Sequence, residues 1–217
     1  MRRIAHSGCI WLIAAILVGA TICLAQYRVL PGKLDADGIP TSAARICLGA
    51  SGTDHCYTPP SDKYAFGLDP TARTIAKINR KDLILFTATF YGGGSGDLTN
   101  LALLEERGGE FVNLLPVLQL TNQSEYRFWG LSRFSTLPVL VTADFVWDFE
   151  AHETHFAHHR YSIHGYAYDP KTGKYTEQTH YVTFKKYPGL DEVDSVHVLD
   201  AERQAVIASL GKTHLPS

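Results

Sequence analysis

The chain has 217 residues, of which 45% are hydrophobic and 19% are charged, and its formal net charge is -2. These values are ordinary for a globular protein, and they exclude a disordered chain, a collagen-like or coiled-coil rod and a multi-pass membrane protein. The 20 basic side chains do not outnumber the 22 acidic ones. Because a protein that binds the phosphate backbone of a nucleic acid needs a surplus of basic side chains, we expect no nucleic-acid partner.

Residues 1–25 have the layout of a secretory signal peptide. Two arginines near the start are followed by residues 9–25, which carry no charge and are mostly apolar. Small residues then stand at the -3 and -1 positions of a cleavage site before Gln26. The alternative is an uncleaved anchor that contacts the membrane through residues 9–25 alone. This stretch has 17 residues. That length is marginal for a spanning helix, which needs about 20 apolar residues. On either route residues 26–217 cross a membrane, which predicts a periplasmic or extracellular location.

Residues 26–70 are rich in turn-forming residues and form a predicted lead-in to a single β-rich domain over 71–217. Cys47 and Cys56 are the two cysteines outside the predicted signal peptide. In an exported chain, two cysteines at this short spacing favour one disulfide that closes a small loop.

A short helix is predicted near residues 70–78. Asp69 suits the N-cap position and Pro70 the first helical position. Ala72 and Ile75 would then share one face. A second helix is predicted near residues 200–210, with Asp200 as its N-cap.

Between these helices the apolar residues alternate with polar ones, which indicates β-strands. Pro116 interrupts one of the apolar runs, which predicts an edge or bulged strand there. The segments with this pattern are 81–90, 98–105, 111–120, 137–149, 158–168 and 175–184. The sequence therefore predicts an α+β fold that is mainly β, in which antiparallel hairpins form a sandwich or an open barrel-like sheet.

The segment 137–149 has an apolar face and an acidic face, as expected of an antiparallel strand with one side in water. Pairing it with 158–168 through a turn near residues 152–154 places Asp144 opposite Ser162. The same register places Asp148 opposite His158.

Histidines and carboxylates gather at the tip of this predicted hairpin. Imidazole and carboxylate groups together suit zinc or another first-row divalent metal. The spacing does not match the HExxH motif of metalloproteases. The alternative is a structural hairpin with cross-strand ion pairs. The candidate metal ligands are Asp148, Glu150, His152, His155 and His158.

A second candidate site lies on the neighbouring strand. His164, Tyr166 and Tyr168 share one face at period two and form a candidate platform for a sugar or a peptide. The alternative is ordinary aromatic packing within the sheet.

No catalytic motif is intact in the sequence, so we assign no catalytic residues and favour a non-enzymatic role. The glycine-rich run 92–96 matches neither a dinucleotide-binding loop nor a nucleophile elbow. We expect an exported binding or envelope-associated domain whose partner is an unidentified small ligand or envelope component. The alternative is a metal-binding protein or metal-dependent hydrolase that uses the cluster at residues 148–159.

Overall fold

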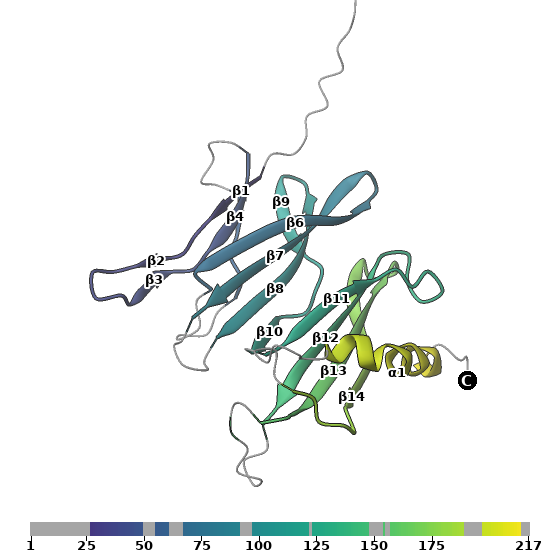
Figure 1. Ribbon diagram of the computed structural model, residues 1–217. Helices are drawn as coiled ribbons and strands as arrows, with labels where there is room; N and C mark the ends of the chain where they lie inside the picture. The colour runs from purple at the N-terminus through teal and green to yellow at the C-terminus, as the bar shows by residue number, and fades with distance from the viewer. Residues whose placement is uncertain are drawn as a thin grey trace, which may run out of the picture.

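The computed structural model describes residues 27–49, 55–60, 67–91, 97–121, 123–147, 154, 157–188 and 197–213. The predicted signal peptide and the glycine-rich run therefore lie outside the described residues. Within these ranges the chain forms short and long strands followed by one helix (Figure 1). The elements are β1 (Tyr27–Leu30), β2 (Lys33–Leu34), β3 (Pro40–Ser42), β4 (Arg45–Leu48), β5 (Cys56–Tyr57), β6 (Asp69–Ile78), β7 (Lys81–Phe90), β8 (Leu98–Arg107), β9 (Glu110–Asn113), β10 (Leu118–Thr121), β11 (Glu125–Trp129), β12 (Val139–Val146), β13 (Arg160–Asp169), β14 (Lys174–Val182) and α1 (Val198–Thr213).

The strands form four antiparallel sheets, and the predicted mainly β, antiparallel fold with a C-terminal helix is confirmed. The central sheet has the order β10-β8-β7-β6, with β9 also paired to β8. The outer sheet has the order β11-β12-β13-β14, and the small sheet has the order β1-β4-β5. Strands β2 and β3 form a separate hairpin. The described strands do not form a closed barrel.

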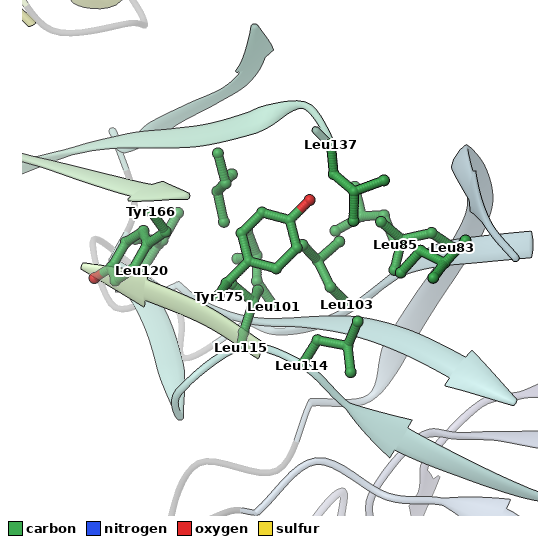
Figure 2. Close-up of a cluster of buried hydrophobic side chains, with 12 residues drawn as sticks. Leu83, Leu85, Leu101, Leu103, Leu114, Leu115, Leu120, Leu137, Tyr166 and Tyr175 are labelled. Atoms are coloured by element: carbon green, nitrogen blue, oxygen red, sulfur yellow. The ribbon is translucent and has the colours of Figure 1, made fainter. Parts of the chain in front are cut away.

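The sheets are stacked in layers, each joined to the next by a hydrophobic cluster. Ile46 of the small sheet packs on Phe86 of the central sheet. The other face of the central sheet packs on the outer sheet, where Tyr175 lies among leucines of both layers (Figure 2). The far face of the outer sheet is covered by α1, seen in yellow in Figure 1. Leu210 of the helix and Ile163 of β13 are both fully buried there.

Polar contacts also hold α1 against the outer sheet. Glu125 of β11 is 8% exposed and accepts a hydrogen bond from the backbone N–H of Leu199 at the start of the helix, at 3.0 Å. A carboxylate at this position satisfies an unpaired helix N–H and complements the helix dipole. On the second turn, Glu202 accepts hydrogen bonds from the hydroxyls of Tyr181 and Tyr187. The helix predicted near 200–210 is confirmed, but it spans Val198–Thr213. Asp200 therefore lies in its first turn, and the prediction that Asp200 is the N-cap is wrong.

The short helix predicted near 70–78 is wrong, because this segment is strand β6. Pro70 fits because β6 is an edge strand of the central sheet, where a missing N–H costs no ladder bond. A bulge at Ile75 breaks the alternation of apolar residues and produces the helix-like spacing. Asn79 and Arg80, both with positive φ, form the two-residue turn into β7.

The water-facing side predicted for strand 137–149 is also wrong. Strand β12 lies inside the outer sheet and is covered on both faces. Val141 packs beneath α1, whereas Leu140 packs toward the central sheet. Asp144, the one acidic residue of this face within the described part of the chain, lies between the two sheets and accepts hydrogen bonds from Thr121 of β10.

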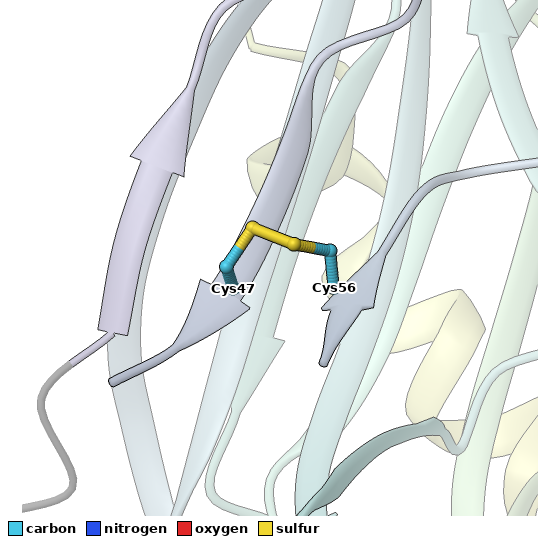
Figure 3. Close-up of a disulfide and its surroundings, with 2 residues drawn as sticks. All are labelled: Cys47 and Cys56. Atoms are coloured by element: carbon cyan, nitrogen blue, oxygen red, sulfur yellow. A yellow bond between two sulfur atoms is a disulfide. The ribbon is translucent and has the colours of Figure 1, made fainter. Parts of the chain in front are cut away.

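The predicted disulfide between Cys47 and Cys56 is confirmed (Figure 3). The two cysteines are directly opposite each other on the neighbouring strands β4 and β5. The bridge ties β5 into the small sheet. In the described part of the chain, α1 lacks the length and apolar character needed to cross a membrane.

Candidate metal site on the outer sheet

Most of the metal cluster predicted at the hairpin tip lies outside the described residues. Asp148, Glu150, His152 and His155 belong to this undescribed part, and His158 is exposed at its margin. The convergence of these five side chains therefore stays a prediction. The register on which it was built is observed nearby, because Asp144 is paired with Ser162.

The second candidate group lies on β13. His164 and Tyr166 stack with their ring centroids 6.2 Å apart. Tyr166 is only 6% exposed and belongs to the core between the two large sheets. Tyr168 packs against the same core and meets the ring of Tyr175 edge-on. The tyrosines thus offer little surface to a ligand, and His164 is the accessible member of the group.

A β-bulge brings two further side chains to His164. On β13, His164 is paired with His180 and Tyr166 is paired with Glu177, so Gln178 of β14 has no partner. This extra residue shifts the alternation of β14 by one. As a result Glu177 and His180 lie on one face although they are three residues apart. In a regular strand they would lie on opposite faces.

The four polar side chains at this position form a continuous hydrogen-bonded cluster. The Ser162 Oγ atom is 2.9 Å from Nε2 of His164 and 3.1 Å from Nε2 of His180. The other ring nitrogen of His164, Nδ1, is 2.6 Å from Oε1 of Glu177. The two imidazoles stack 4.2 Å apart with an interplanar angle of 10°. We call Ser162, His164, Glu177 and His180 the bulge cluster.

The carboxylate sets the direction of the hydrogen bonds. Ionised Glu177 can only accept, so Nδ1 of His164 must carry a proton. When His164 is neutral, its Nε2 atom is then an acceptor, and the Ser162 hydroxyl donates to it. The Ser162 oxygen in turn accepts from Nε2–H of His180. Both Nε2 atoms are therefore directed at the same point.

Asp144 adds negative charge beside the bulge cluster. It lies on β12 opposite Ser162 and accepts hydrogen bonds from the backbone N–H and the hydroxyl of Thr121. Burial raises the pKa of Asp144, while the Thr121 hydrogen bonds and the nearby His164 act in the opposite direction. A carboxylate in partly desolvated surroundings is stabilised when a cation approaches.

The composition and exposure of the bulge cluster suit a metal ion. One ligand atom from each of His164, Glu177 and His180 can be chosen so that all lie within 4.8 Å of one another. The side chains of His164 and Glu177 are 28% and 45% exposed, and His180 is exposed, so solvent ions reach them. Imidazole nitrogen suits zinc, copper, nickel and iron rather than magnesium or calcium.

The sequence analysis named His164 as a candidate binding residue and placed Ser162 opposite Asp144, but it gave Ser162 no role and missed Glu177 and His180. The strand that carries them was expected, but strict alternation separates the two residues. The only local signal was a polar Thr-Glu-Gln-Thr stretch, which does not identify a bulge.

No protein-family model matches the chain, and the searches of curated proteins and of solved structures found no match either.

Proposed function

We propose that this protein is an exported domain that binds a divalent transition-metal ion at the bulge cluster. The single observation that supports this most is the convergence of Nε2 of His164 and Nε2 of His180 on one point, beside a carboxylate that holds the first ring. Two imidazoles that share one approachable point are the basic requirement of a histidine metal site.

An exported location is part of this proposal. The disulfide between Cys47 and Cys56 is compatible with an oxidising compartment, where such bridges persist. The apolar N-terminal segment also supports export. The intact mass of the protein purified from the exported fraction tests this, because cleavage before Gln26 removes residues 1–25. An unchanged N-terminus would instead indicate the uncleaved anchor.

Metal binding is tested with protein that carries no histidine tag. We expect the full-length gene product to bind zinc when titrated in a calorimeter. The double variant His164→Ala/His180→Ala should lose this ion. A matched variant, His152→Ala/His155→Ala, also removes two histidines but leaves the bulge cluster intact, and it should keep the ion.

Two results would count against the proposal. Wild-type protein that binds no zinc, copper or nickel would exclude a metal site at the bulge cluster. Binding that disappears only in the His152→Ala/His155→Ala variant would move the site to residues 148–159. Loss of one ion in each variant would support two separate sites.

A second function has a specific observation in its favour. The order Ser162 Oγ, His164 Nε2, His164 Nδ1, Glu177 Oε1 is that of a serine nucleophile, its base and an orienting carboxylate. Acyl transfer also needs N–H donors aimed at the developing oxyanion. Ser162 lies on β13, whose backbone is paired on both sides, so strand N–H groups point along the sheet and away from Oγ. We therefore favour metal binding.

The two functions are separated by a reactive probe. A serine nucleophile would be labelled by a fluorophosphonate in the wild type and left unlabelled in Ser162→Ala. Under the metal proposal neither protein is labelled, and Ser162→Ala still binds zinc.

A further inference from the structure

The bulge cluster offers an ion two different modes of binding, and the structure favours one of them. In the first mode the ion bonds to Nδ1 of His164 and to the Glu177 carboxylate. In the second it bonds to Nε2 of both imidazoles. The modes differ in the role of Glu177, which is a ligand in the first and not in the second.

The contact between His164 and Glu177 argues against the first mode. Nδ1 and Oε1 are 2.6 Å apart and share a proton, which is the distance of a charge-assisted hydrogen bond. Two ligand atoms on a tetrahedral zinc ion, each about 2.0–2.1 Å from the metal, stand well over 3 Å apart. The ion would have to force these two side chains apart and displace their proton.

The second mode keeps this contact. Nε2 of His164 and Nε2 of His180 both face the Ser162 hydroxyl, at 2.9 and 3.1 Å. An ion that enters where the hydroxyl bonds now converge breaks two neutral hydrogen bonds and keeps the charged one. His180 must also change tautomer, moving its proton from Nε2 to Nδ1 through solvent, before its Nε2 atom can bind the ion. The rings are nearly parallel, so they must tilt toward the ion. The terminal torsion of histidine is broad enough to allow this at low cost.

We infer that the ion binds through Nε2 of His164 and His180 in place of the Ser162 hydroxyl, and that Glu177 is a positioning residue outside the coordination sphere. Glu177 holds the His164 ring with its proton on Nδ1, which leaves Nε2 as the ligand atom. This inference rests on the proposed function. Carboxylates that hold ligand histidines in this way are common around protein metal sites.

This coordination defines the class of ion and what else can bind to it. Two nitrogen ligands favour copper(II), nickel(II) and zinc(II) over manganese(II), calcium(II) and magnesium(II). The protein supplies two ligands, so the remaining positions face solvent and accept water or a donor atom from a second molecule. The β-bulge at Gln178 is the backbone feature that brings Glu177 within reach of His164.

Copper(II) is the probe that reads the coordination directly. Electron paramagnetic resonance of the wild type with one equivalent of copper should show coupling to two imidazole nitrogens. Glu177→Gln should keep the two-nitrogen spectrum and bind copper about 10–100-fold more weakly, which is the usual effect of losing such a partner. His180→Ala should lose the second nitrogen. Ser162→Ala should bind at least as tightly as the wild type, because the competing hydroxyl is gone.

A charge control and a tautomer measurement separate positioning from general electrostatics. Asp144→Asn removes a negative charge beside His164 without touching its Nδ1 atom, and it should weaken copper binding less than Glu177→Gln does. Long-range proton–nitrogen correlation spectra of the metal-free protein should show the proton of His164 on Nδ1 in the wild type. In Glu177→Gln both tautomers should appear, while the spectrum of His180 changes little.

The outcomes distinguish this inference from the proposed function. If wild-type protein binds no metal ion, the proposed function itself fails. If copper binds but Glu177→Gln binds as tightly as the wild type, Glu177 does not position His164. If Glu177→Gln loses an oxygen ligand and binding collapses as in His180→Ala, Glu177 is a ligand. Either of the last two results overturns the inference and leaves the metal site in place.

Discussion

The two faces of β13 carry opposite chemistry although their residues alternate along one strand. Tyr161 and Ile163 face α1 and are fully buried. Ser162 and His164 face the other way and are only partly buried, whereas Tyr166 on this face belongs to the core. At this end of β13 the fully buried apolar side chains therefore lie on the helix side. The opposite face can therefore hold polar groups that water and ions reach.

The largest expected effect compares neighbouring residues on the two faces. Ile163→Ala should lower the free energy of unfolding by about 3 kcal/mol, because it leaves a cavity beneath α1. His164→Ala removes an accessible side chain and should cost less than about 1 kcal/mol. Urea denaturation of both variants measures this. Equal losses would show that the two faces contribute alike to stability.

The same Glu→Gln substitution can be made on each face. Glu202→Gln should cost about 1–2 kcal/mol, because the amide has one accepting oxygen and at least one of Tyr181 and Tyr187 loses its partner. Glu177→Gln should cost less than about 0.5 kcal/mol in metal-free protein, because this pair is exposed. If the same denaturation shows a larger loss of stability in Glu177→Gln than in Glu202→Gln, the polar contacts on the helix side do not contribute more to stability.

The buried carboxylate beside the bulge cluster predicts a pH dependence of stability. Burial raises the pKa of Asp144 above the ordinary value of 3.8. The folded state therefore keeps this proton to higher pH than the unfolded chain, and the Asp144 contribution to stability falls as the pH rises through that window. Asp144→Asn lacks this loss, so the variant should gain stability relative to the wild type as the pH rises above 3.8.

Denaturation of both proteins over a pH series from 4 to 7 checks this sign. A difference between variant and wild type that stays constant with pH would show that Asp144 titrates alike in the folded and unfolded chains.

The smallest effect concerns the residue where the polar face meets the core. Burial, assisted by the nearby Glu177 charge, raises the pKa of Tyr166 from 10.0 to about 12. The stability that this phenol contributes is complete below pH 10 and is lost as the pH rises toward 12. Tyr166→Phe should show a shallower loss over the same range. Difference absorbance of phenolate between the two proteins should locate the Tyr166 titration near the upper end of this range.

Much of the fold follows from alternation and turn signals in the sequence. The pairing of Asp144 with Ser162 was predicted from the length of the hairpin, and the turn at 170–173 joins β13 to β14 as its Asp-Pro-x-x-Gly pattern indicates. The helix near 70–78 failed because Asp-Pro suits the start of a helix and of an edge strand equally. Here the pairing of β6 with β7 decided between them.

Only the part of the bulge cluster that lies on β13 could be placed from the sequence. Alternation places His164 on the face of Ser162, but no local pattern shows that Gln178 is unpaired. That bulge brings Glu177 and His180 to one side, and it lies in a strand that contacts both β13 and α1. One such contact is the hydrogen bond between Thr179 and Ser209 of the helix. Burial of strand β12 on both faces likewise depends on how the sheets stack.

The most direct test of the metal site is a crystal of the protein grown with zinc and measured on both sides of the zinc absorption edge. We predict an anomalous peak about 2.0–2.1 Å from Nε2 of both His164 and His180, with the Glu177 carboxylate still on Nδ1 of His164. A peak bonded to other residues, or crystals saturated with zinc that show no peak at the bulge cluster, would contradict metal binding through these two Nε2 atoms.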